Sequence, residues 1–322
     1  MGNEGSVLNE DKLEKEKKSK EHLHQECIQL IEAHPLEDYE KHEFIGTSAY
    51  NKIFSATHKA SKCKVVVKAL TKKYTEHCNF SYPPDEVLIL QNIDHKFILK
   101  CFEVIILENI TFMVTEMIPG QEFFDYFEAQ NTHWEEEKVR IYARHIADII
   151  HYLHKLNICH RDIKLENFVL DKNSMPKLID FGFACKFAKG LVLTKYCGSP
   201  DYASPEIWLS KPYLGPDLDI WAFGIILYIL ATSFVPFLNP HQVVDLQLNY
   251  PAGIKLSDDF KEMMKGIFKY AFLRWDIETL ITCKWMQHKL PDPPVEKIFK
   301  QPTKEEITKN IIEHYSDNIP KE

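Results

Sequence analysis

The stretch that decides the fold is the polar octapeptide His160-Arg161-Asp162-Ile163-Lys164-Leu165-Glu166-Asn167. Eighteen residues after Asp162 comes a second short motif, Asp180-Phe181-Gly182. Further along the chain stand Ser204-Pro205-Glu206, Asp219-Ile220-Trp221-Ala222-Phe223-Gly224 and Arg274, and upstream a β-branched run ends in a lysine, Val65-Val66-Val67-Lys68. One of these motifs alone would be weak evidence, whereas the set in this order and spacing is specific.

Periodicity around the motifs changes once along the chain. From Tyr39 to about Thr115 the sequence is rich in β-branched and aromatic runs, which predict strands, and a helical patch at 84–93 interrupts them. From Phe123 onward, apolar residues recur at helical spacing in four segments, 138–156, 218–232, 258–269 and 277–286. The pattern predicts an α+β fold, with a small β-rich lobe followed by a larger helical lobe.

Together the motifs resemble the eukaryotic protein-kinase family over residues 39–287. Lys164 and Ser199 are typical of the serine/threonine class, and the segment 197–200 looks most like the calcium/calmodulin-dependent and AMP-activated kinase group. The resemblance implies a two-lobed kinase fold, in which an antiparallel sheet with helix αC forms the small lobe. It places that lobe at about 39–116 and the mainly helical lobe at about 121–287. A charged extension, 1–38, precedes the domain, and a tail, 288–322, follows it.

The resemblance also implies the chemistry, in which ATP and Mg²⁺ take part. Phosphoryl transfer needs groups that position the reactants and neutralise charge. Asp162 would orient the attacking hydroxyl, Lys164 would lie beside the transferred group, and Asn167 and Asp180 would hold magnesium. Lys68 would bind the α- and β-phosphates, braced by Glu86. The expected nucleotide contacts are Ile45, Gly46, Ile53, Val66, Lys68, Glu86, Glu116, Ile118, Glu122, Val169 and Asp180.

Several positions depart from the family pattern. Of the glycines in GxGxxG only Gly46 is present, so we expect weakened nucleotide affinity, and the alternative reading is a pseudokinase that acts as a scaffold. Val66 replaces a small alanine above the adenine ring, opposite a small Thr115. A column of side chains links the lobes of active relatives, and here it would consist of Leu90, Cys101, His160 and Phe181. Cys101 is smaller than the usual leucine, which should loosen the active arrangement.

Helix αC and the activation segment also differ. Pro83 and Pro84 predict that the helix begins just after them, with Glu86 near its start. Tyr82 stands where relatives carry a His or Arg that grips the activation-segment phosphate, and Lys195 stands where many carry the phosphorylated threonine. A lysine supplies no negative charge, which leaves Thr194 as the alternative acceptor.

Further residues indicate substrate choice and internal support. Glu122 and Glu166 favour substrates with basic residues upstream of the Ser/Thr acceptor, although Glu122 could instead hold the ribose. Ser199 is expected to bridge Asp162 and Lys164. Asp219 is expected to anchor the catalytic-loop backbone, and Glu206 with Arg274 (in the helical lobe) to form a buried structural ion pair.

Composition narrows the class of protein. With 39 basic and 47 acidic residues the net charge is −8, which argues against a general nucleic-acid partner. No apolar run approaches the ~20 residues of a membrane-spanning helix, and the 8 cysteines contain no CxxC pair, so we expect a reduced, cytoplasmic protein.

The N-terminus and the calcium-binding patterns complete the expectations. Residues 1–6 fit the myristoylation pattern M-G-x-x-x-[ST] with Gly2 as acceptor, and the alternative is a flexible start. A single myristoyl chain binds membranes only marginally, so any tether would be weak and reversible. The sequence has no D-x-D-x-D-G loop, so no EF-hand calcium site is expected.

Overall fold

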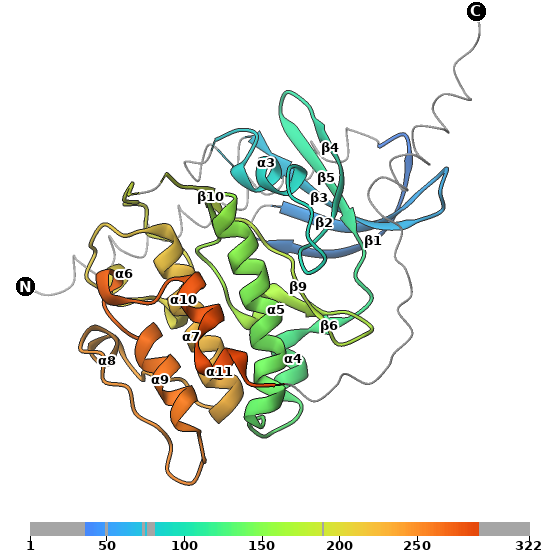
Figure 1. Cartoon of the computed structure of the whole chain (residues 1–322). Coiled ribbons are helices and arrows are strands. Elements are labelled where there is room, and N and C mark those ends of the chain that lie inside the picture. The colour runs from blue at the N-terminus through green and yellow to red at the C-terminus, as the bar shows by residue number, and fades with distance from the viewer. Residues whose placement is uncertain (1–35, 49–50, 73–74, 76–80, 189, 290–322) are drawn as a thin grey trace, which may run out of the picture. The chain divides into compact units, whose positions relative to one another are not determined.

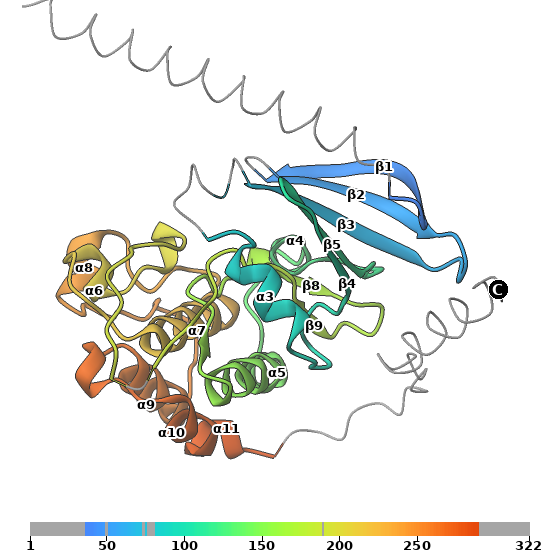
Figure 2. The same cartoon turned by 90° about the horizontal axis from the view of Figure 1, so that it is seen from above.

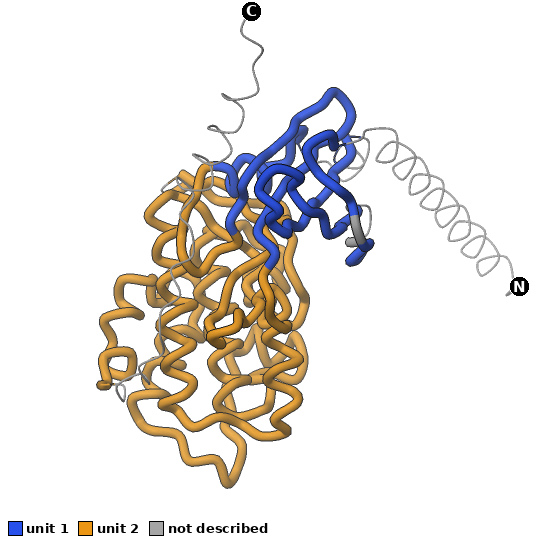
Figure 3. Tube along the Cα trace, turned by 90° about the vertical axis from the view of Figure 1, so that its right-hand side faces the viewer, with its two compact units in different colours: residues 1–91, 100–117, 299–322 blue, residues 92–99, 118–298 orange. Residues whose placement is uncertain are grey.

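The computed structural model describes residues 36–48, 51–72, 75, 81–188 and 190–289. Residues 1–35 of the charged N-terminal extension, with the myristoylation pattern at Gly2, and the tail beyond Lys289 lie outside these residues. The chain divides into two compact units (Figure 3). Among the described residues, unit 1 holds those up to Gln91 together with 100–117, and unit 2 holds 92–99 and everything from Ile118 onward.

Unit 1 is built on one antiparallel sheet, whose strands follow the order β1-β2-β3-β5-β4, visible from above in Figure 2. Its strands are β1 (Tyr39–Ser48), β2 (Asn51–His58), β3 (Lys64–Thr71), β4 (Cys101–Ile106) and β5 (Ile110–Glu116). All neighbouring strands pair antiparallel. In chain order α3 lies between β3 and β4, and β5 follows β4 and pairs with both β3 and β4. The strand-like first part of the sequence is therefore a real sheet.

Alternation along β3 decides which way its side chains point. Val65, Val67 and Ala69 are buried in the core of the unit, where they pack with Phe112 and Val114 of β5. Because successive side chains in a strand point to opposite faces, Val66 and Lys68 share the other face. The hydrophobic run before Lys68 thus fixes the direction in which its ammonium group extends.

The helix of unit 1, α3 (Asp85–Gln91), begins directly after the proline pair. Val87 N donates to Pro84 O at 3.0 Å, closing the first turn. Its residues Glu86, Val87, Ile89 and Leu90 are buried. The prediction that the helix starts here and carries Glu86 in its first turn is confirmed, although the helix is shorter than the patch 84–93.

Unit 2 is mainly helical, as Figure 1 shows. Its helices are α4 (Phe123–Glu128), α5 (Glu136–Lys155), α6 (Pro205–Trp208), α7 (Gly215–Thr232), α8 (Pro240–Val244), α9 (Asp258–Ile267), α10 (Ile277–Thr282) and α11 (Lys284–Gln287), with short 3-10 turns η1 (Leu165–Asn167), η2 (Pro200–Tyr202) and η3 (Ala271–Leu273). Together with the sheet of unit 1, this confirms the α+β prediction and the two-lobed kinase fold.

Two helices form the centre of unit 2. Helix α5 buries one apolar stripe, including Val139, Ile146 and Leu153, and packs against α7. Of the helices that the structure describes, α7 alone has the length and hydropathy to cross a membrane, but 83% of it is buried inside the protein. That burial is what a core helix of a globular domain requires.

Short strands position the polar motifs of unit 2. The strands are β6 (Gln121–Glu122), β7 (Ile158–Cys159), β8 (Phe168–Leu170), β9 (Pro176–Leu178) and β10 (Cys185–Lys186). Strand β7 leads into the octapeptide, and β8 and β9 form a hairpin between its end and Asp180. Ile179 N donates to Asn167 O at 2.9 Å, so the two motifs that lie apart in sequence are adjacent in space.

Candidate active site

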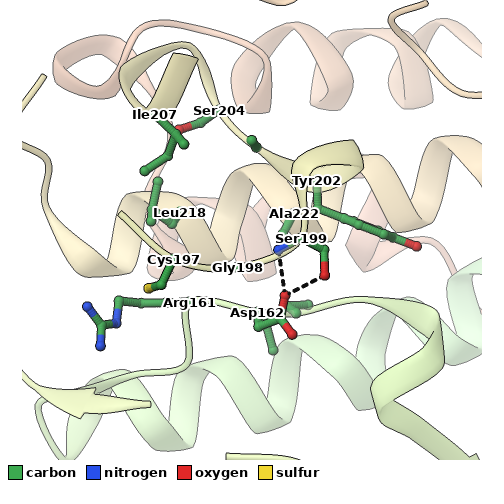
Figure 4. A pocket seen from close by; sticks show the side chains of 12 residues that line it. Arg161, Asp162, Cys197, Gly198, Ser199, Tyr202, Ser204, Ile207, Leu218 and Ala222 are labelled. Carbon is green, nitrogen blue, oxygen red and sulfur yellow. Dashed lines mark hydrogen bonds between the residues drawn. The ribbon is translucent and has the colours of Figure 1, made fainter. Parts of the chain in front are cut away.

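The carboxylate of Asp162 is the centre of the polar cluster in unit 2. Its Oδ1 accepts hydrogen bonds from Ser199 N and Ser199 Oγ, both at 2.9 Å (Figure 4). Its Oδ2 lies 3.0 Å from Lys164 Nζ and accepts from Asn167 Nδ2 at 3.1 Å. The residue is only 6% exposed. Because both oxygens are engaged from different sides, the carboxylate has one fixed orientation.

Ser199 links the catalytic loop to the activation segment. Lys164 Nζ donates to Ser199 Oγ at 2.7 Å, so the predicted bridge between Lys164 and Asp162 is present. Gly198 makes it possible, because its φ of +94° is one that residues with a side chain rarely adopt. A Cβ at Gly198 would also lie 2.5 Å from Arg161 O. The motif therefore needs glycine before the serine.

Asp219 of α7 holds the backbone of the catalytic loop. Its Oδ2 accepts from His160 N at 2.9 Å and its Oδ1 from Arg161 N at 2.7 Å. His154 Nε2 bonds to the same carboxylate at 2.9 Å. Arg161 has φ +64°, an uncommon left-handed conformation that persists only where neighbours enforce it. The predicted anchoring role of Asp219 is confirmed.

Asn167 and Asp180 are the predicted magnesium ligands, and the donor set fits that ion. The Nδ2 of Asn167 donates to Asp162 O at 2.8 Å, so the amide oxygen is the atom that could bind a cation. Asp180 Oδ1 accepts from Gly182 N at 3.0 Å. No cluster of three or more His, Cys, Asp or Glu side chains suited to a metal occurs among the described residues. A carboxylate and an amide oxygen are donors that suit Mg²⁺, which keeps waters and phosphate oxygens as its other ligands.

His160 contacts the backbone of Asp180 and the side chain of Phe181. Its Nε2 donates to Asp180 O at 2.5 Å, and its ring meets that of Phe181 edge-on, with centroids 4.9 Å apart. Both rings are buried. His160 thus packs against Phe181 and donates a hydrogen bond to the backbone. In unit 1, the other two members of the expected column, Leu90 and Cys101, are also buried.

Lys68 and Glu86 form an ion pair within unit 1. Lys68 Nζ lies 2.6 Å from Glu86 Oε1, and the glutamate side chain is 5% exposed. Val66, on the same face of β3 as Lys68, pairs across the sheet with Thr115. The expected pairing of the β3 lysine with the acid of α3 is therefore present in the structure.

The predicted nucleotide contacts divide between the units. Unit 1 carries Ile45, Gly46, Ile53, Val66, Lys68, Glu86 and Glu116. Gly46 on β1 pairs with Ile53 on β2, and the loop between these strands lies partly outside the described residues. Unit 2 carries Ile118, Glu122, Val169 and Asp180, and Glu122 pairs with Val169 across β6 and β8. Nucleotide binding by these residues stays a prediction.

Two tyrosines near the site carry no motif signal, and sequence reasoning missed them. Tyr202 Oη donates to Glu166 Oε2 at 3.2 Å. Tyr213 Oη donates to Lys195 O at 2.5 Å and accepts from Arg161 Nη1 at 3.3 Å. Arg161 Nε also donates to Phe183 O at 2.8 Å. Arg161 therefore has a phenol and a backbone carbonyl as hydrogen-bond partners.

Glu206 and Arg274 form the predicted structural ion pair. Arg274 Nη2 donates to both carboxylate oxygens of Glu206, at 2.9 and 3.2 Å, and both residues are buried. Burial opposes the charge on Glu206, but the guanidinium and further hydrogen bonds outweigh it and lower the pKa of this carboxyl. The pair joins α6 to the segment after α9.

Comparison with known proteins agrees with this geometry. The profile of the protein kinase domain matches residues 39–286. The chain belongs to the protein kinase family. It is 31% identical over 265 residues to the serine/threonine-protein kinase SIK3 homolog of Danio rerio, covering 81% of this chain and 22% of that protein.

Two further relatives give the same result. Identity is 34% over 244 residues to maternal embryonic leucine zipper kinase of Xenopus tropicalis, covering 74% of this chain and 34% of the relative. It is also 34% to serine/threonine-protein kinase SIK1 of Mus musculus, covering 76% and 29%. The chain thus spans about a fifth to a third of the length of these relatives. They are related to the AMP-activated kinase, which confirms the predicted resemblance.

Proposed function

We propose that this chain is a serine/threonine protein kinase that transfers the γ-phosphate of ATP, with Mg²⁺, to Ser/Thr hydroxyls of proteins. The observation that carries the proposal is the Asp162 carboxylate, held from both sides by Ser199, Lys164 and Asn167. A carboxylate fixed in this way is suited to orient a hydroxyl and accept its proton.

Each remaining group has a matching task. Lys164, 3.0 Å from Asp162, places a positive charge where the transferred phosphoryl group would pass. Asn167 and Asp180 would hold Mg²⁺, which when bound neutralises charge on the phosphate oxygens. In unit 1 Lys68 would bind the α- and β-phosphates, and Glu86 at 2.6 Å keeps its side chain extended. Protein kinases generally use ATP and Mg²⁺, in line with this assignment.

We propose a preference for substrates with arginine upstream of the acceptor. Glu166 and Glu122 are both exposed, so their carboxylates are open to a basic peptide side chain. The Tyr202 hydroxyl at 3.2 Å orients Glu166 through one oxygen and leaves the second for a guanidinium. Charge-assisted pairs of this kind can distinguish arginine from neutral residues.

A scaffold without phosphate transfer is the second candidate. One observation favours it, because only Gly46 of the expected three glycines is present in the phosphate loop. The intact set Lys68, Glu86, Asp162, Asn167 and Asp180 argues for transfer, since a scaffold has no need of all five.

The deciding experiment measures γ-phosphate transfer from Mg·ATP to arginine-directed serine peptides by the purified full chain. Asp180→Ala serves as the blank, and Asp162→Asn tests the carboxylate while keeping its shape. Transfer that both substitutions reduce at least about a hundredfold supports the kinase, since each removes a charge acting on the transition state. No transfer by folded wild type at saturating ATP would favour the scaffold.

The same assay tests specificity. Replacing the upstream arginine of the peptide by alanine should raise KM for wild type and have little effect in Glu166→Ala. Equal rates for both peptides with wild type would refute the arginine preference.

The cellular location is a separate proposal. We propose a cytoplasmic protein that associates weakly and reversibly with membranes through a myristoylated Gly2. Mass spectrometry of the N-terminal peptide from eukaryotic cells would test it, because the modification adds one saturated acyl chain to that residue.

A further inference from the structure

Tyr82 makes two hydrogen bonds that tie the start of α3 to the sheet. Its hydroxyl donates to Leu107 O at 2.6 Å, in the turn between β4 and β5. The same hydroxyl accepts from Thr111 Oγ1 of β5 at 3.1 Å. Lys72 Nζ lies 5.8 Å from the centre of the tyrosine ring. The phenol therefore connects three segments of unit 1.

The helix that follows needs such support. Helix α3 has 7 residues, and helices this short are unstable on their own in water. Its buried side chains Val87, Ile89 and Leu90 hold one face against the unit. Glu86 lies in the first turn, between the exposed Asp85 and the buried Val87. Tyr82 precedes Glu86 by four residues, and its hydroxyl is tied to atoms of the sheet.

Glu86 in turn controls Lys68. The carboxylate is 5% exposed and lies 2.6 Å from the ammonium. If the first turn moved outward by a few ångströms, the ion pair would break and the lysine side chain would lose its fixed direction. The positions of Tyr82 and Lys68 are thus linked through one short helix.

We propose that Tyr82 is a positioning residue, whose hydroxyl bridge to Leu107 and Thr111 holds the first turn of α3 so that Glu86 stays paired with Lys68. The inference rests on the proposed kinase function, because it assigns the regulation of that same site. It makes the paired arrangement a property of unit 1 itself, set by a neutral hydroxyl that requires no added phosphate.

The chemistry of the phenol suits this task. Burial raises the pKa of Tyr82, and the hydrogen bond from Thr111 opposes that rise only in part. The hydroxyl consequently stays protonated and remains a donor to Leu107 at neutral pH. A bridge of this kind does not change with pH across the physiological range.

The first test removes only the hydroxyl. Tyr82→Phe keeps the ring and should lower kcat/KM for ATP about tenfold, the effect of losing one well-formed hydrogen bond. KM for the peptide should not change, because the site for the acceptor lies on residues of unit 2. Thr111→Val, which removes the second partner, should act in the same direction, and the two substitutions together should cost less than their sum.

Tyr39→Phe is the matched control. Tyr39 Oη donates to Glu103 Oε2 at 2.6 Å within the same unit, from β1 to β4, and neither residue belongs to α3. Its loss should lower stability to a similar extent without altering ATP kinetics. An equal loss of kcat/KM in both variants would show a general structural effect and overturn the proposal.

The decisive measurement is made in a Glu86→Gln background. If Tyr82 acts through Glu86, Tyr82→Phe should have no further effect on kcat/KM there. A full additional loss would overturn the proposal.

Amide hydrogen exchange over residues 87–91 supplies a readout that needs no phosphate transfer. Tyr82→Phe should speed exchange in α3, whereas Tyr39→Phe should not. Unchanged exchange in Tyr82→Phe would overturn the proposal even in an active enzyme. Absence of transfer by wild type would instead refute the proposed function, and the exchange result would still decide the role of Tyr82.

Discussion

Replacement of Asp217 by asparagine should stabilise the protein near neutral pH. Asp217 lies in the first turn of α7, and its Oδ2 is buried without a hydrogen-bond partner among the described residues. Burial raises its pKa from 3.8 to about 6, and Arg274 opposes that shift only partly. The folded protein therefore disfavours the charged carboxylate, which asparagine removes while keeping the shape.

The size of the expected gain in stability follows from the pKa shift of Asp217. A rise from 3.8 to about 6, at about 1.36 kcal/mol per unit, corresponds to about 3 kcal/mol at pH 7.5. The sign follows because the folded pKa is the higher one. The Asp217 carboxyl costs no stability at pH values below its unfolded pKa. The penalty grows as the pH rises from the unfolded toward the folded pKa and levels off above it. We therefore expect Asp217→Asn to raise the free energy of unfolding by about 3 kcal/mol at pH 7.5 and by about 1.6 kcal/mol at pH 5.

Urea unfolding of wild type and Asp217→Asn at several pH values between 5 and 7.5 measures this gain. Asp276→Asn is the matched control, because hydrogen bonds from Thr279 lower the pKa of that N-cap carboxylate. The same chemical change should there give no gain at pH 7.5. If Asp217→Asn destabilised the protein, or its gain did not depend on pH, the reasoning about the unpartnered carboxylate would be wrong.

Two further substitutions test contacts in unit 2. Ser199→Ala removes the hydroxyl between Lys164 and Asp162 and should lower kcat by about ten- to a hundredfold. Ser199→Thr keeps a hydroxyl and should restore most of the activity. Steady-state kinetics measure both variants, and a Ser199→Ala rate equal to wild type would refute the bridge. Glu206→Gln leaves Arg274 buried without its carboxylate and should lower the free energy of unfolding by about 3–5 kcal/mol. A loss below about 1 kcal/mol in urea titration would mean that the backbone carbonyls around Arg274 are enough to stabilise its buried charge.

Contacts in the site could be predicted from the sequence where both partners belong to recognisable motifs. Asp162, Ser199 and Asp219 each belong to a recognisable stretch, so their mutual contacts could be expected before any coordinates. The same holds for the buried pair of Glu206 and Arg274. The β-rich and helical halves could be expected as well, because the period of apolar residues differs between strand and helix.

Other contacts could not be expected, because one partner is a backbone carbonyl. Tyr82 donates to Leu107 O and Tyr213 to Lys195 O. Every residue carries such an acceptor, so no side-chain pattern marks the partner, and only the folded chain determines which carbonyl a phenol can reach. The burial of Asp217 without a hydrogen-bond partner for Oδ2 could not be predicted either, because the sequence does not distinguish a buried aspartate from an exposed one.

The two phenols lead to one conclusion about how this chain differs from its relatives. In unit 2 Tyr213 holds the backbone at Lys195 and receives a hydrogen bond from Arg161, at the position where the resemblance places a phosphate. In unit 1 Tyr82 directs its hydroxyl to the sheet and carries no positive charge with which to bind a phosphate. Lys195 supplies no negative charge and Tyr82 no positive charge, which leaves Thr194 as the alternative acceptor of a phosphate in the activation segment. In each unit a neutral tyrosine hydroxyl fixes one backbone segment by donating to a carbonyl, Leu107 O in unit 1 and Lys195 O in unit 2, and such a bond depends on no charged partner.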